Sequence, residues 1–126
     1  MKFLRKAIMA LFITGAFIAC KKDHDAPAFK IEGSWTGKIG TGAETPSGQY
    51  ALNIKAGGNL ERIGATGSVS ASGSWNLTGN TFTGIYFYSN GTVVDVTGTV
   101  DKSTNKITGT WENNGAEEGT LYVNKQ

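Results

Sequence analysis

The stretch GSWNLTGNTFTGIYFYSNGTVVDVTGTVDKSTNKITGTW, which runs from Gly73 to Trp111, decides the fold because it contains one pattern twice. Each copy has a glycine, a turn with asparagine and a second glycine flanked by large apolar residues, and the copies are offset by 25 residues. The matched positions are Gly73 with Gly98, Asn80 with Asn105, Phe82 with Ile107, Gly84 with Gly109 and Tyr86 with Trp111. A strand, a polar turn and a second strand make a β-hairpin, so the stretch predicts two consecutive hairpins.

Alternation with a period of two residues continues outside this stretch, from Ile31 onward. Such alternation is typical of strands with one buried face, and 18 glycines against 2 prolines suit tight turns between strands. Two loops rich in small residues, 40–47 and 67–72, interrupt the pattern. We therefore expect eight strands, over residues 31–39, 50–54, 60–65, 73–77, 82–88, 94–100, 107–111 and 119–123.

The connections between these strands are short, which forces neighbouring strands to run antiparallel. An even number of strands brings the last strand beside the first so that the sheet can close, and closure removes both exposed edges. Glycines on the apolar face, such as Gly73 and Gly109, permit the bends of a tightly coiled barrel and leave room for neighbouring rings. The sequence predicts an all-β, eight-stranded antiparallel up-and-down barrel over residues 30–126. A two-sheet sandwich is the alternative, but it requires longer crossovers.

The first 19 residues have the three zones of a secretory signal peptide. Basic residues come first, an apolar helical run follows over residues 7–18, and a small residue precedes Cys20, the only cysteine. Residues 17–20 resemble the lipobox of bacterial lipoproteins, in which the cysteine is acylated and the chain is cut just before it. The resemblance implies a signal peptide over residues 1–19 and lipidation of Cys20. The alternative is an ordinary signal cut at a nearby site, which leaves a free thiol.

The composition of residues 20–29 predicts a lipidated, charged tether. The segment has few apolar side chains that a core could bury, and it contains a proline. By resemblance to Gram-negative lipoproteins, Lys21 directly after the cysteine implies the outer membrane, with the protein facing the periplasm or the cell surface. His24 stands between two aspartates, but a flexible tether cannot hold the geometry of a metal site. Without the three basic residues of the signal peptide, the chain has 9 basic and 10 acidic residues. This balance leaves no basic surface that would indicate a nucleic-acid partner.

The triplet Gly33-Ser34-Trp35, followed by a meander of eight strands, is similar to the opening of lipocalin and avidin-type barrels. The resemblance extends over residues 31–123 as architecture only. It transfers no binding residue to this chain, because no further motif of those families is present.

Catalysis is not indicated by the residues. The single histidine lies in the tether and the single cysteine is the anchor, which removes Ser-His-Asp, Cys-His and zinc mechanisms. We interpret the carboxylates as solvated surface charges and not as catalytic groups, and the alternation places Asp95 on the outer face of its strand. We expect no enzyme activity and no cofactor.

Seven aromatic side chains project inward on this register, and five of them are the candidate ligand-binding residues: Trp35, Trp75, Tyr86, Tyr88 and Trp111. They predict a protein that binds a small apolar or glycan-like ligand. Because an eight-stranded barrel is narrow, the rings should fill most of it and leave at most a shallow cup at one mouth. The alternative function is a protein–protein module, an inhibitor or an assembly accessory, with a filled core.

Overall fold

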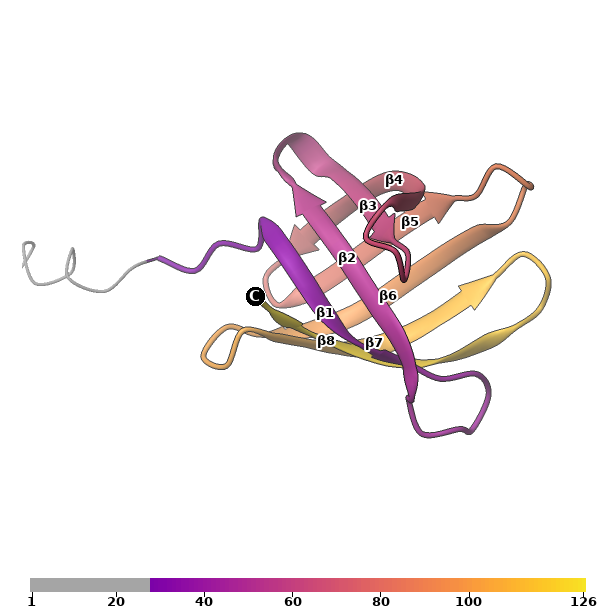
Figure 1. Ribbon diagram of the computed structural model, residues 1–126. Coiled ribbons are helices and arrows are strands. Elements are labelled where there is room, and N and C mark those ends of the chain that lie inside the picture. Colours follow the sequence, from indigo (N-terminus) through magenta and orange to yellow (C-terminus); the bar gives the residue numbers. More distant parts are fainter. Residues whose placement is uncertain (1–27) are drawn as a thin grey trace, which may run out of the picture.

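The computed structural model describes residues 28–126. The predicted signal peptide over residues 1–19, Cys20 and most of the predicted tether over residues 20–29 lie outside the described residues. Within residues 28–126, no helix has the length and the apolar character needed to cross a bilayer. Eight strands and one short 3₁₀ turn follow one another: β1 Gly33–Ile39, β2 Gly48–Lys55, η1 Ala56–Gly58, β3 Asn59–Ile63, β4 Val69–Thr78, β5 Thr81–Phe87, β6 Val93–Asp101, β7 Lys106–Asn113 and β8 Glu118–Lys125 (Figure 1).

All eight strands belong to one sheet that closes on itself. Each strand pairs antiparallel with the next one in the chain, and β8 returns to pair with β1. This closing seam runs from Trp35 opposite Lys125 to Ile39 opposite Leu121. The predicted all-β, eight-stranded up-and-down barrel is therefore confirmed, and the sandwich alternative is wrong because there is no second sheet among the described strands.

The barrel has two different ends. We call one the tether pole, because the chain enters there at the start of β1; it also carries η1 and the short turns 79–80 and 102–105, and the C-terminus lies there (Figure 1). We call the other the loop pole, because it carries the connections 40–47, 64–68, 88–92 and 114–117. Phe29, the last residue of the predicted tether, already packs against the barrel core.

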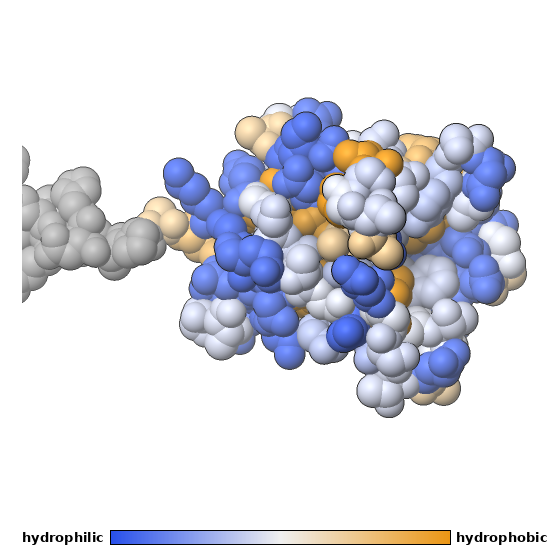
Figure 2. All heavy atoms as spheres, viewed as in Figure 1, coloured by the Kyte–Doolittle hydropathy of each residue, from blue (hydrophilic) through white to orange (hydrophobic). Residues whose placement is uncertain are grey.

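Alternation fills the interior with apolar side chains. Along β6, for example, Val94, Val96 and Val100 are buried while the residues between them are exposed, except for the inward Gly98. Trp35, Tyr50, Phe82 and Tyr86 are each no more than 1% exposed. The face of the barrel shown in Figure 2 is mostly hydrophilic, with apolar residues visible only in small separate areas.

Inward glycines let adjacent strands approach closely. A Cβ atom on Gly73 would lie 1.9 Å from the carbonyl oxygen of Ile85, and one on Gly109 would lie 2.1 Å from that of Thr97. The space in front of these glycines is therefore occupied by the backbone of the neighbouring strand and not by aromatic rings. Glycine is needed at these positions for the close backbone packing of the coiled barrel.

One loop is shorter than the sequence predicts. Residues 67–72 are expected to be a loop because they are small and polar, yet β4 begins at Val69. Residues Val69 to Ser72 pair with the end of β3 across a register shift between Arg62 and Ile63. Serine and alanine have low strand propensity, but here the ladder to β3 and β5 determines the conformation.

Candidate functional site

Trp35 and Trp75, two of the five predicted ligand-binding residues, lie toward the tether pole. Trp35 is fully buried, and its indole Nε1 donates a hydrogen bond to the carbonyl oxygen of Ile31 at 2.8 Å. Trp75 is half-buried, and its Nε1 donates to the carbonyl oxygen of Lys55 at 2.7 Å. Each indole therefore has its polar atom satisfied by the backbone of the barrel itself, as expected for rings that serve packing.

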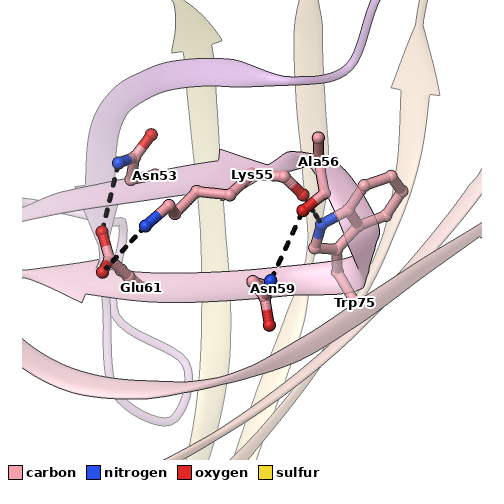
Figure 3. A network of polar contacts seen from close by, with 6 residues as sticks. All are labelled: Asn53, Lys55, Ala56, Asn59, Glu61 and Trp75. Atoms are coloured by element: carbon pink, nitrogen blue, oxygen red, sulfur yellow. Dashed lines mark hydrogen bonds and ion pairs between the residues drawn. The ribbon is translucent and has the colours of Figure 1, made fainter.

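Trp75 stands beside a small polar network on the β2–β3 hairpin (Figure 3). Asn53 donates to Glu61 at 3.1 Å, and Lys55 forms an ion pair with the same carboxylate at 3.5 Å. Asn59 donates to the carbonyl oxygen of Ala56 at 3.4 Å and so closes the turn. Because the Lys55 side chain is half exposed, this ion pair contributes little to stability. The role of the network is to support the turn between β2 and β3.

The other three predicted residues, Tyr86, Tyr88 and Trp111, lie together toward the loop pole. Tyr86 is buried and its ring meets that of Tyr88 edge-on, with centroids 5.8 Å apart. Tyr88 directly follows β5 and is half-buried. Trp111 is 9% exposed, and its Nε1 donates to the carbonyl oxygen of Gly40 at 2.9 Å, which fixes the start of the loop 40–47.

The interior between the two poles is filled. The hydroxyl groups of Tyr50 and Tyr86 form a hydrogen bond of 3.0 Å inside the barrel. Burial raises the pKa of Tyr86 to about 12, and it raises the pKa of Tyr50 well above its usual value. Among residues 28–126, no buried side-chain nitrogen or oxygen lacks a hydrogen-bond partner. Trp35, Tyr86 and Trp111 therefore belong to the buried apolar core of the barrel, and Trp75 and Tyr88 pack against it. The two cavities described below lie on the outer face.

Arg62 is a residue whose role sequence reasoning missed. It stands opposite the buried Leu52 and Ala71, so its side chain belongs to the inner face of β3. Its guanidinium carbon lies 4.5 Å from the ring centre of Tyr50. The signal was present in the sequence, because a lone base occupies an apolar position of an otherwise alternating strand.

A groove crosses the outer face of strands β4 to β8, at right angles to the strands. Its two walls are rows of outward-facing residues, joined from strand to strand by directly opposed pairs. The first row consists of Asn76, Thr83, Thr97, Thr110 and Thr120. The second row consists of Ser74, Ile85, Asp95, Glu112 and Glu118. We call this feature the outer groove.

The outer groove consists of two cavities that meet at Asp95. One, of about 280 Å³, lies over β4 to β6, and the other, of about 380 Å³, lies over β6 to β8. Gly84 and Gly119 contribute to the floor, and Gly42 of the loop 40–47 lines the far end. Because neighbouring strands lie about 4.8 Å apart, five strands give the groove a length of about 19 Å.

Three carboxylates stand side by side in the second row. Asp95 is directly opposite Glu112, and Glu112 is directly opposite Glu118. None of them forms an ion pair, since the one ion pair within residues 28–126 is that of Lys55 with Glu61. Like charges in directly opposed positions destabilise a sheet. The row therefore lowers stability and makes the groove electronegative. Within the described part of the chain, no three or more His, Cys, Asp or Glu side chains are arranged to hold a metal ion.

These observations define the chain as a small closed β-barrel with a filled interior and a polar outer groove. No protein family matches the sequence, and no curated protein matches it either. Two β-barrels are among the solved structures that share the fold. One is a redesigned β-barrel with a TM-score of 0.63 and 16% identity, and the match covers 76% of this chain and 91% of that one. The other is a de novo designed fluorescence-activating β-barrel with a TM-score of 0.55 and 11% identity, covering 75% and 93%. At these identities the likeness shows the fold alone.

Proposed function

We propose that this protein is a non-catalytic lipoprotein of the bacterial outer membrane that binds an extended glycan along the outer groove. The observation that carries the proposal is the pair of residue rows that flank the groove without interruption across five strands. The membrane anchor in the proposal is Cys20, as the resemblance to lipoproteins implies.

The chemistry of the rows favours a glycan. Hydroxyl, amide and carboxylate groups line the groove together with apolar atoms, including those of Ile85. Such groups form hydrogen bonds with sugar hydroxyls, and carboxylates accept the stronger ones. The cavity volumes fall at or near the usual range for ligand sites, which begins at about 300 Å³.

The closed barrel argues against a peptide strand as the occupant of the groove. A peptide usually adds to a sheet by pairing with the free backbone groups of an edge strand. Every strand described here already has two neighbours, so the groove offers side chains only. A ligand rich in hydroxyl groups and bound through side chains suits this surface better.

The filled interior also bears on the ligand. The sequence alone admits an apolar ligand inside the barrel, held by Trp35, Trp75, Tyr86, Tyr88 and Trp111. Trp35 and Tyr86 are buried against their neighbours, and Trp75 and Trp111 are bonded to backbone carbonyl groups. Of the two ligand classes expected from the sequence, the glycan-like one on the outer surface therefore has the better support.

The test is retention of the purified barrel on a panel of immobilised neutral and amino-substituted oligosaccharides. We expect wild-type protein to bind at least one of them, and we expect Glu112→Gln and Thr110→Val to weaken that binding by about tenfold each, because each removes groove hydrogen bonds. Thr108→Val is the matched control, since Thr108 lies on the same strand and face but outside the groove lining.

A second control, Glu44→Gln, removes an exposed carboxylate of the loop 40–47 that does not line the groove. Binding that the two control variants weaken as much as the groove variants do would contradict the outer groove as the site. Failure of the whole panel to bind would contradict the glycan proposal.

A protein partner is the second candidate function, and a different observation favours it. Val69 and Phe87 are the exposed large hydrophobic residues of the described chain, each 51% exposed. Both lie on strands at the ends nearest the loop pole, where an incoming protein would meet them. Cross-linking on intact cells tests this function: a partner that is captured by wild-type protein and lost in Phe87→Ser supports it, and recovery of uncross-linked monomer alone counts against it.

A further inference from the structure

We propose that the loop pole holds a second binding site, in which Arg62 pairs with the carboxylate of a small organic acid. The site is independent of the outer groove, because Arg62 lies on the inner face of β3 and the groove lies outside β4 to β8.

The side chain of Arg62 is partly removed from water. Arg62 is half-buried, and its charge lies over the face of the Tyr50 ring at 4.5 Å from the ring centre. Tyr86 lies next to Tyr50 through the bond between their hydroxyl groups, and Tyr88 packs against Tyr86. A cation is thus held in an aromatic mouth by a cation–π contact.

No negative charge of the barrel neutralises this cation. Among residues 28–126, no carboxylate lies within ion-pairing distance of Arg62. Its hydrogen-bond acceptors are neutral carbonyl groups of the backbone, those of Gln49, Ala51 and Ile63. The neutral Tyr86 hydroxyl is also close enough for the guanidinium group to act against the rise in the pKa of Tyr86. A half-buried cation without a counter-ion is costly, and an anionic ligand removes that cost.

A count of donors shows which edge of the guanidinium group remains for a ligand. Arginine has five N–H donors in a planar fork. Nη1 donates to Ala51 and Ile63, and Nη2 donates to Gln49. None of these three bonds uses the Nε–H, and Nε and Nη2 share one edge of the guanidinium plane. Two parallel donors on one edge match the two oxygens of a carboxylate.

The surroundings indicate the rest of the ligand. Tyr88 is half-buried at the mouth, so its ring offers an apolar wall to a ligand whose carboxylate reaches Arg62. The filled interior prevents a long chain from entering the barrel. A small acid with an aromatic or short aliphatic body, lying across the loop pole, therefore fits this site.

The experiment uses benzoate as the probe and proton–nitrogen NMR spectra of the isotope-labelled protein. We expect benzoate to shift the Arg62 Nε–H resonance, whereas benzamide, which has the same shape without the charge, should leave it in place. Inorganic phosphate at equal ionic strength separates a carboxylate site from a site for any anion, and a larger shift with phosphate than with benzoate would overturn the carboxylate assignment.

The second part of the experiment compares variants of the protein. Arg62→Gln should weaken benzoate binding by about tenfold or more, because it removes a charge-assisted bidentate pair. Arg62→Lys keeps the charge but loses the planar edge, so it should also bind more weakly than wild type. Lys38→Gln, which removes a charge from an exposed outward position, should bind as wild type does.

Two further results would overturn the proposal: an Arg62 Nε–H resonance that benzoate does not shift in wild-type protein, or benzoate affinity that is equal in wild type and Arg62→Lys. The first of these needs no variant, so it holds even if Arg62→Gln does not fold. Glycan binding by the outer groove is unaffected by either result, which keeps the two sites separately testable.

Discussion

Replacing Gly73 by alanine tests the tight coiling on which the whole barrel depends. The new Cβ would lie 1.9 Å from the carbonyl oxygen of Ile85 and 2.8 Å from the Cα of Tyr86, and both are backbone atoms of β5. Because Cβ atoms essentially never approach heavy atoms within 3.0 Å, β4 and β5 must separate locally. No flexible side chain is available there to absorb the shift.

The expected loss of stability follows from that separation. Overpacking of this kind costs about 1–3 kcal/mol, and each ladder hydrogen bond that opens costs roughly 0.5–1.5 kcal/mol more. Against this, alanine in place of glycine returns about 0.5–1 kcal/mol of backbone entropy. With one ladder bond opened, the middle of these ranges gives a net destabilisation of about 2 kcal/mol, a substantial part of the total for a domain whose stability is about 5–15 kcal/mol.

Urea unfolding followed by tryptophan fluorescence measures this difference. Gly64→Ala is the matched control, because its nearest neighbour atom would lie 3.6 Å away and its φ is not in the left-handed region. We expect the control to change stability by less than about 1 kcal/mol. If Gly73→Ala and Gly64→Ala have the same stability, the close approach of β4 and β5 is refuted, and with it the register from which the outer groove is built.

Three further predictions concern charge, pH and anchoring. Because burial raises the pKa of Tyr86 to about 12 from its usual 10.0, the unfolded chain loses this proton at lower pH than the folded protein. The stabilisation that this pKa shift contributes is therefore complete below pH 10 and should fall by about 2 kcal/mol by pH 12, a slope that Tyr86→Phe should reduce in pH-dependent urea unfolding. Glu112→Gln should raise stability by about 0.2–1 kcal/mol for each opposed carboxylate that it relieves, and a lower melting temperature would contradict the repulsion in the second row. Cys20→Ser should move the protein from the membrane fraction to the soluble fraction and abolish labelling with a radioactive fatty acid; an unchanged membrane fraction would count against the lipid anchor.

The sequence predicts the barrel well because the rules involved are local. A period of two assigns the face of nearly every strand residue, and connections of a few residues leave antiparallel pairing as the one arrangement. The prediction fails at Val69 to Ser72, where small polar residues resemble a loop but are held in β4 by their neighbours. Only the tertiary context distinguishes the two outcomes.

The internal repeat also has a limit. Gly84 and Gly109 occupy equivalent positions in the two copies, yet a Cβ on Gly84 would meet the end of the Leu60 side chain, whereas one on Gly109 would meet the backbone of Thr97. A repeat in sequence specifies the hairpin but not what packs against it. The same limit applies to the candidate site residues, because alternation gives the face of Trp75 and Tyr88 but not their height along the barrel. Height depends on the stagger between strands, which places these two rings toward opposite poles.

The outer groove and the role of Arg62 could not be predicted from the sequence, for two different reasons. The groove is a relation among five strands, and it emerges only when each register is known. The outward position of Asp95 was predictable, but its alignment with Glu112 and Glu118 was not. Arg62 interrupts the apolar positions of its strand, and this interruption can be seen in the sequence. What the sequence does not show is that the side chain is half-buried at the loop pole beside Tyr50.

The seam between β1 and β8 sets the order in which the molecule can assemble. It joins Trp35 to Lys125, residues near opposite ends of the described chain, whereas every other strand pair is a hairpin of near neighbours. Closing such a long loop carries a large entropic cost, and β proteins dominated by distant pairings fold slowly. A ribbon of hairpins should therefore form first, with its aromatic side uncovered and both outermost strands unpaired. During that interval the nascent protein is most prone to aggregate, and a chaperone that covers the aromatic side and the unpaired strands would protect it best.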